Sequence, residues 1–136
     1  MARILAIDYG TKKTGLAVTD PLQIIVTGLA TVPTTELLDY LEKYFGDEDV
    51  EKVVFGESTN EDGSHTNLHS HVVGFSRKIK KKYPELHIDW QDEYGTSKRA
   101  KDILLHSGVP QKKRREKERV DKIAAVLILQ DYLGHH

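Results

Sequence analysis

The apolar positions of this chain change their spacing several times, and each spacing predicts a different element. In the first third, three short apolar runs separated by turn residues predict strands over residues 3–8, 14–19 and 24–32. Turns this short join antiparallel neighbours. Apolar residues then recur at helical spacing, which predicts a helix that is capped by Thr34 or Thr35 and ends near Gly46.

The remaining pattern alternates strands with helices. Strands are predicted over residues 50–56, which form a buried apolar run, and 86–91, where apolar and polar residues alternate. Helices are predicted from their apolar spacing and caps over residues 68–79, from Thr96 or Ser97 to Leu104, and over 120–133. The basic segment 111–119 has no apolar periodicity and is predicted to be a mobile loop.

These elements predict an α/β fold with a five-stranded mixed sheet. Right-handed crossovers would place the strand ending at Phe55 beside the first strand and parallel to it, with the strand ending at Gln91 beyond. The sheet then has three antiparallel strands followed by two parallel ones, and helices flank it. The 136 residues suit one domain, which is expected to span residues 1–136.

Two predicted strands end on carboxylates. Asp8 ends the first strand and enters a glycine-containing turn, and Asp92 and Glu93 follow the last strand. In open α/β sheets, functional sites lie at the carboxyl ends of parallel strands, so these acids should share one edge. Asp121, in the first turn of the closing helix, could reach the same edge. Adjacent residues at a strand end point to opposite faces, so Asp92 could take the place of Glu93.

Carboxylates that converge without histidine or cysteine suit a hard cation, so Mg²⁺ or Mn²⁺ is the predicted ligand. Two such ions could activate a water and stabilise the leaving oxygen in phosphodiester hydrolysis. Taken singly, each acid could equally be an ordinary helix cap or a solvent-exposed group.

Charge is segregated along the chain although the net charge is only −1. Residues 35–62 carry ten carboxylates against two lysines, so this stretch should repel nucleic acid. A basic segment precedes Asp121 and is the better phosphate-binding candidate, together with two lysines of the first turn; the residues proposed are Lys12, Lys13, Lys112, Lys113, Arg114 and Arg115. Such contacts would give affinity without sequence specificity.

Composition excludes several classes of protein. The chain has no cysteine, which rules out disulfides and thiolate metal sites. It lacks a signal-peptide pattern and an apolar run of membrane-spanning length, so a cytoplasmic protein is expected. Either a monomer or a weak homodimer would fit, and a two-fold substrate could recruit a dimer.

Four motifs follow one another along the chain: residues 8–17 (DYGTKKTGLA), 60–64 (NEDGS), Asp92-Glu93 with Thr96-Ser97, and 120–125 (VDKIAA) with 128–129 and 132–133. They resemble the motifs of the YqgF family, also called RuvX, of ribonuclease H-like proteins. They occur in the family's order, and the resemblance covers nearly the whole chain.

The resemblance implies a ribonuclease H-like fold and a metal-dependent nuclease with Asp8, Glu93 and Asp121 as its metal-binding catalytic acids. It also implies a role in 5′-end processing of precursor 16S ribosomal RNA, with ribosome-assembly proteins as possible partners. A Holliday-junction resolvase-like activity on branched DNA is the alternative.

Two departures from the family pattern bear on activity. Tyr94 stands where the family usually has arginine, which removes a phosphate contact or a carboxylate partner. Gly56-Glu57-Ser58 replaces Gly-Leu-Pro, and Glu57 could join a metal shell or repel substrate. A non-catalytic RNA- or protein-binding module is therefore a further alternative.

Other residues give weaker indications of function. His65 and His69 have the i, i+4 spacing of a zinc pair, and His71 is near, but such groups are usually surface residues. Trp90 is expected in the core. The Asp-x-Gly-Thr turn also occurs in actin-like and sugar-kinase ATPases, but 136 residues leave no room for their second lobe. His135 and His136 could be native or a tag remnant.

Overall fold

The computed structural model describes residues 2–57, 68–92, 100, 103 and 113–134, with the backbone alone for residues 113–121. Its elements in chain order are β1 (Arg3–Asp8), β2 (Lys13–Thr19), β3 (Val26–Pro33), the short 3₁₀ helix η1 (Thr34–Glu36), α1 (Leu37–Asp47), β4 (Val50–Glu57), α2 (His69–Lys82), β5 (His87–Asp92) and α4 (Lys113–Leu133). Within these residues, no helix combines the length and the apolar character that crossing a bilayer requires.

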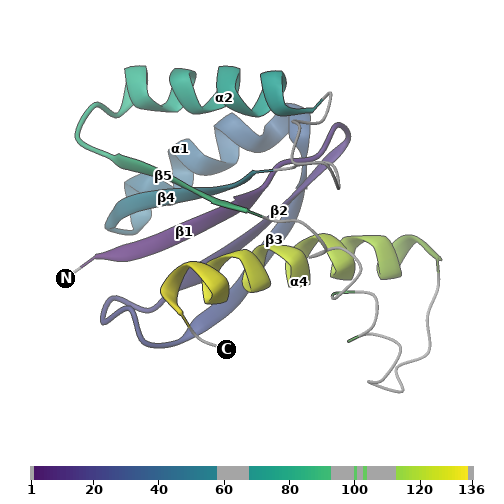
Figure 1. The fold of residues 1–136 in the computed structure, drawn as a ribbon. Helices are drawn as coiled ribbons and strands as arrows, with labels where there is room; N and C mark the ends of the chain where they lie inside the picture. Colours follow the sequence, from purple (N-terminus) through teal and green to yellow (C-terminus); the bar gives the residue numbers. More distant parts are fainter. Residues whose placement is uncertain (1, 58–67, 93–99, 101–102, 104–112, 135–136) are drawn as a thin grey trace.

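The five strands form one mixed sheet in the order β3-β2-β1-β4-β5 (Figure 1). β2 pairs antiparallel with both β1 and β3, whereas β4 pairs parallel with both β1 and β5. The predicted topology is therefore confirmed, and every strand begins and ends within two residues of its predicted bounds. β1 is the central strand.

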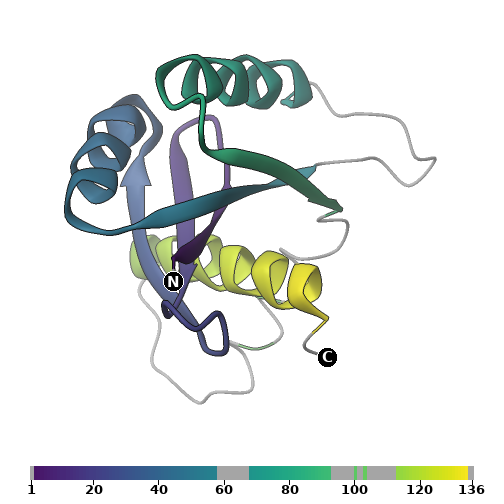
Figure 2. The same cartoon turned by 90° about the vertical axis from the view of Figure 1, so that its left-hand side faces the viewer.

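Helices cover both faces of the sheet, with α1 and α2 on one side and α4 on the other (Figure 2). The face covered by α1 and α2, here called the α1/α2 face, holds the larger apolar cluster, which includes Leu5, Ile7 and Phe55. On the α4 face, Ile4 and Ala6 pack with apolar residues of α4. The alternation of side chains along β1 thus splits the core into two layers, and burial of each large side chain stabilises the fold by about 1.5–3 kcal/mol.

Trp90 is partly buried against the larger cluster, and its ring centroid lies 5.3 Å from that of Phe55. Its predicted place in the core is confirmed.

The first helix begins differently from the prediction. Thr34 and Thr35 lie in η1, and α1 starts at Leu37 with Glu36 at its N-cap and no side-chain capping bond. The threonine cap prediction is wrong because the Thr34 hydroxyl bonds to the turn after β1 instead. The predicted helix beginning at Thr96 or Ser97 lies mostly outside the described residues.

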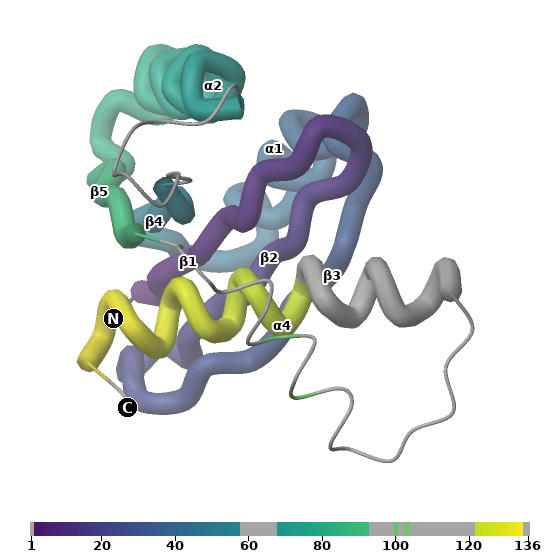
Figure 3. The backbone as a smooth tube through the Cα atoms, turned by 45° about the vertical axis from the view of Figure 1, so that its right-hand side comes forward, coloured from purple at the N-terminus to yellow at the C-terminus, as the bar shows by residue number. Residues whose placement is uncertain are grey.

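The closing helix is longer than its apolar pattern indicates. α4 begins at Lys113, so the prediction of a loop over 111–119 is wrong from that residue onward, while residues 111 and 112 lie outside the described part. Lysine, arginine and glutamate are strong helix formers, so a basic segment can continue a helix without an apolar face. Figure 3 shows α4 crossing β1, β2 and β3.

Candidate active site at the end of strand β1

Asp8 is the last residue of the central strand, and the chain turns sharply after it. The turn requires glycine at position 10, because a Cβ added there would lie 2.1 Å from the carbonyl oxygen of Lys13. That oxygen belongs to the backbone and cannot swing away as a side chain would. The glycine therefore fixes the direction in which the chain leaves Asp8.

Two threonines hold this turn through a closed ring of hydrogen bonds. The Gly10 N–H donates to Thr14 Oγ1 at 3.5 Å, and the Thr34 hydroxyl donates to the Gly10 carbonyl at 2.7 Å. The two hydroxyl oxygens are 2.9 Å apart. Because each hydroxyl has one hydrogen and that of Thr34 is used on Gly10, Thr14 is the donor to Thr34.

The ring ties the turn to the start of η1. Thr14 is fully buried, and the Thr34 N–H also donates to the Lys12 carbonyl at 2.9 Å. These bonds join three segments: the end of β1, the start of β2 and the start of η1. The segments meet at the turn that follows Asp8. The turn is therefore ordered by its own glycine together with part-buried polar contacts to η1.

The register places Asp8 on the α4 face. It follows Ala6, which packs on that face, by two residues, whereas the neighbouring Tyr9 packs on the α1/α2 face with its ring 5.5 Å from that of Phe75. On β2 the residue opposite Asp8 is Gly15. Glycine has no side chain, so residue 15 contributes only backbone at this pair.

Glu57 and Asp92 also lie at this edge of the sheet, where they pair with each other across β4 and β5. Each comes two residues after an aromatic residue of the α1/α2 face, Phe55 and Trp90 respectively. Strand alternation therefore assigns both to the α1/α2 face, opposite Asp8. The two additional acids considered from the sequence share the edge with Asp8 but not the face.

α4 covers the face on which Asp8 lies. The buried Ala125 packs with Ala6 and Ala17 of the two central strands. The backbone of Asp121 lies in α4, one helical turn before Ala125. Glu93, Tyr94 and Lys112 lie outside the described residues, and the side chains of Asp121, Lys113, Arg114 and Arg115 do too.

A chain of hydrogen bonds fixes the other end of α4 to the parallel strands. Lys52 Nζ of β4 donates to the Tyr132 hydroxyl at 2.9 Å, and that hydroxyl donates to Asp89 Oδ2 of β5 at 2.5 Å. The bond from Tyr132 and then the backbone N–H of Trp90 lower the pKa of Asp89. The bond to Tyr132 likewise raises the pKa of Lys52. These contacts set how α4 lies across the sheet.

The first turn also carries the two predicted phosphate-binding lysines. Lys12 is exposed in the turn, and Lys13, which is half-buried, begins β2. Of the suspected histidine cluster, His69 lies with its ring 6.3 Å from that of Trp90, and His65 is outside the described residues. Among the described residues, no group of three histidines or carboxylates is placed to hold a metal ion.

Sequence reasoning missed two features that shape this site. Thr14 appeared only as part of a strand, and Thr34 only as a helix cap. A threonine at a strand's start does not reveal a partner 20 residues away, so no local signal identifies their ring. No local signal identifies the contact of Lys52 with Tyr132 either, because the two residues are 80 positions apart.

The sheet order and the helices on both faces define a ribonuclease H-like fold. Solved structures share the fold. The crystal structure of a fowlpox virus resolvase with substrate Holliday junction DNA matches with a TM-score of 0.59 at 12% identity, over 97% of each chain. That of the fowlpox virus Holliday junction resolvase matches with a TM-score of 0.56 at 14% identity and the same coverage.

The sequence then specifies the family within this class. Residues 2–135 match the family described as RuvX: Holliday junction resolvase, and the chain belongs to this family. It is 47% identical over 133 residues to a protein of Christiangramia forsetii, covering 98% of both chains. It is 46% identical over 135 residues to one of Porphyromonas gingivalis, covering 99% of this chain and 98% of that one. Both relatives are named "Putative pre-16S rRNA nuclease".

Proposed function

We propose that this protein is a metal-dependent endonuclease that processes the 5′ end of precursor 16S ribosomal RNA during ribosome biogenesis in the cytoplasm. The observation that carries the proposal is the placement of Asp8 at the end of the central strand, in a fixed turn and on the face that α4 covers. The names of the full-length relatives support the substrate. Residues 1–136 form one ribonuclease H-like domain in this proposal.

The proposed metal ligands are Asp8, Glu93 and Asp121, with Mg²⁺ or Mn²⁺ as the ion. Carboxylate oxygens suit these hard cations, and the residue that pairs with Asp8 on β2, Gly15, has no side chain. The backbone of Asp121 lies one helical turn before Ala125, which contacts the Asp8 face, and this supports Asp121 as a proposed ligand. When bound, the ions would activate a water and stabilise the leaving oxygen of a phosphodiester.

The face assignment separates these ligands from the other acids at the same edge. Asp92 and Glu57 fall on the α1/α2 face, so we assign neither of them to the metal shell. Glu57 acts instead as a nearby negative charge that limits how phosphates approach the edge. We therefore propose Glu93 rather than Asp92 as the ligand.

The chain's own cations would hold the nucleic acid. Lys12 and Lys13 flank the turn that follows Asp8, so their ammonium groups can reach a phosphate next to a scissile bond. Lys113, Arg114 and Arg115 begin α4, the helix that also carries Asp121, and Lys112 precedes it. Contacts of this kind position the phosphate backbone without reading its sequence.

A second candidate function is cleavage of four-way DNA junctions. The family's description and the fold shared with a resolvase bound to Holliday junction DNA favour it. Its proposed catalytic residues are the same, since either polymer presents a phosphodiester to the metal site. Ribosome-assembly proteins are proposed partners for the first function only.

The test compares three proteins, the wild type, Asp8→Asn and Asp92→Asn, each with Mg²⁺ or Mn²⁺. The substrates are precursor 16S ribosomal RNA, single-stranded RNA and a four-way DNA junction. We expect precursor RNA to be cut by the wild type and by Asp92→Asn, and Asp8→Asn to lose about 100-fold or more of the activity.

The outcomes separate the alternatives. Cleavage of the junction alone would select the resolvase function. Loss of activity in Asp92→Asn with retention in Asp8→Asn would refute the face assignment. Binding without cleavage by any of the three proteins would identify a non-catalytic RNA-binding module.

A further inference from the structure

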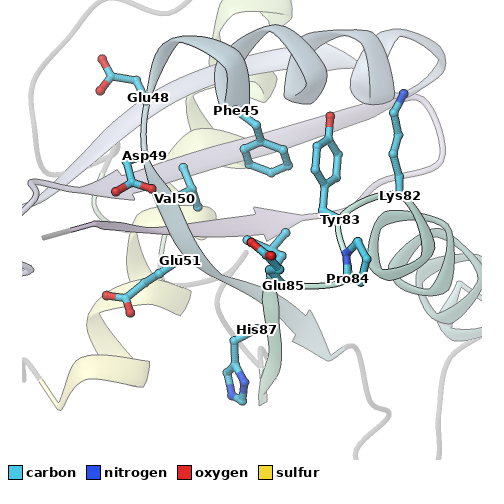
Figure 4. A pocket seen from close by; sticks show the side chains of 11 residues that line it. Phe45, Glu48, Asp49, Val50, Glu51, Lys82, Tyr83, Pro84, Glu85 and His87 are labelled. Atoms are coloured by element: carbon cyan, nitrogen blue, oxygen red, sulfur yellow. The ribbon is translucent and has the colours of Figure 1, made fainter.

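A groove lies at the edge of the sheet opposite Asp8, where the parallel strands β4 and β5 begin (Figure 4). Its volume is about 650 Å³. The end of α1, the start of β4 and the connection from α2 to β5 line it. The groove is therefore separate from the proposed nuclease site, which lies at the carboxyl ends of the same strands.

Apolar side chains form part of the groove. They include Phe45, Tyr83 and Leu86, with the rings of Phe45 and Tyr83 packed edge to face at 5.0 Å. Both rings are only partly buried although they pack against the main apolar cluster. The groove thus offers apolar surface, backed by the rigid core, to a side chain that enters it.

Four carboxylates also line the groove. Glu48, Asp49, Glu51 and Glu85 all line the groove, and Figure 4 shows the carboxylates of Glu48, Asp49 and Glu51 along one side of it. Among the described residues, Lys82 on the rim contacts Glu42 of α1, and Glu48 accepts a hydrogen bond from Arg3 Nε at 3.2 Å. Negative charge therefore dominates the rim, which repels phosphate and attracts basic groups.

A hairpin tip beside the groove presents further apolar surface. Leu22, Ile24 and Ile25 in the β2–β3 connection are 57%, 61% and 63% exposed. The tip is held in one shape because Asp20 Oδ1 accepts hydrogen bonds from the Ile24 and Ile25 N–H groups at 2.7 and 2.8 Å. Gln23 adopts a left-handed backbone conformation with φ of 60°.

The side chain of Gln23 joins the tip to the groove. Its Nε2 donates to the Ala2 carbonyl at 2.9 Å and also contacts Glu51 on the groove's rim. The apolar tip and the acidic groove are consequently parts of one surface, here called the amino-end surface. Large exposed aliphatic residues on a rigid tip beside a charged groove are typical of an interaction site.

We propose that the amino-end surface docks a basic, amphipathic segment of a protein partner. Aliphatic or aromatic residues of that segment would pack on Leu22, Ile24 and Ile25 and enter the groove, while its lysines and arginines would face Asp49, Glu51 and Glu85. Charge complementarity selects this occupant, because the same carboxylates exclude a nucleic-acid strand. One edge of the protein would then hold the partner while the opposite edge holds the substrate.

The proposal is tested by titrating ¹⁵N-labelled protein with a synthetic peptide of about a dozen residues that alternates lysine or arginine with leucine. We expect amide shifts confined to residues 20–25, 48–51 and 82–87, with a Kd of about 10–100 µM at low salt. A second peptide of equal charge has serine in place of leucine, and it should bind at least about tenfold more weakly.

Matched variants locate the binding site on the surface. Asp49→Asn with Glu85→Gln should weaken peptide binding about tenfold, whereas Glu36→Gln with Asp39→Asn, an equal charge change on exposed residues, should leave it unchanged. Ile24→Ser with Ile25→Ser should also weaken it, and the exposure of both residues lets the variant fold.

Several results would overturn the proposal. These are the absence of binding, equal binding of the leucine and serine peptides, equal effects of the two charge variants, and shifts outside the amino-end surface. Stronger binding of spermidine than of the leucine peptide would identify a polyamine site instead. If light scattering showed the wild type to be a dimer and Ile24→Ser with Ile25→Ser to be a monomer, the surface would be assigned to a second copy of the chain.

Discussion

The hydroxyl of Thr34 donates a hydrogen bond of 2.7 Å to the carbonyl oxygen of Gly10, which joins the first residue of η1 to the turn that follows Asp8. The turn is thereby held by a residue 24 positions away along the chain. The same hydroxyl accepts the hydrogen bond of the buried Thr14. Removal of one hydroxyl therefore leaves two other polar groups without their partner.

Thr34→Val should lower the free energy of unfolding by about 1–3 kcal/mol, because the Gly10 carbonyl and the Thr14 hydroxyl lose a half-buried partner. Thr34→Ser, which keeps the hydroxyl, should recover most of the loss. Urea denaturation measures both variants. Equal stability of the valine variant and the wild type would show that the ring of hydrogen bonds contributes nothing.

Gly10→Ala should be strongly destabilising, by about 2 kcal/mol or more, because the new Cβ meets a backbone oxygen at 2.1 Å. Gly74→Ala in α2 is the matched control, since a Cβ there meets nothing within 4 Å. Alanine at that helical position should stabilise the protein by about 0.5–1 kcal/mol. Opposite signs for the two substitutions are expected in thermal denaturation, and a stable Gly10→Ala protein would contradict the geometry of the turn.

Tyr132→Phe should change how stability depends on pH. The hydrogen bond from Tyr132 lowers the pKa of Asp89 in the folded state, so its stabilising effect is present above the ordinary pKa near 3.8 and is lost as pH falls through the folded value. Acidification should therefore lower the free energy of unfolding of the wild type more than it lowers that of Tyr132→Phe.

Urea denaturation between about pH 6 and pH 2.5 measures this difference. Tyr40→Phe is the control, because Tyr40 packs on the α1/α2 face and Tyr132 on the α4 face. If the two phenylalanine variants followed parallel pH curves, the contact between Tyr132 and Asp89 would not be the cause of the effect.

Replacing Lys113, Arg114 and Arg115 by glutamine should weaken binding of precursor RNA and flatten its dependence on salt. Each phosphate contact that is lost should reduce the slope of log K against log salt by about 0.7–0.9. The same change at Arg77, Lys78 and Lys81, exposed on α2, removes equal charge away from the proposed site. Fluorescence anisotropy at several salt concentrations measures both variants, and equal losses would indicate a general charge effect.

The carboxylates illustrate how far the sequence could predict the candidate site. Their place at strand ends follows from local apolar patterns, so the edge was predictable. Their distribution between faces depends on register, which only strand pairing fixes. Pairing sets Asp8 opposite Gly15 on the α4 face and puts Asp92 in line with Trp90 on the other face.

The sequence by itself determined the strand positions, the right-handed crossovers and hence the order of the sheet, because side-chain periodicity and connection handedness are local physical constraints. The tertiary structure decided which hydroxyls hold the Asp8 turn and which acids share a face. Those outcomes depend on contacts between residues 20 to 80 positions apart. Such contacts form only when the two apolar layers have packed, so no local pattern in the chain predicts them.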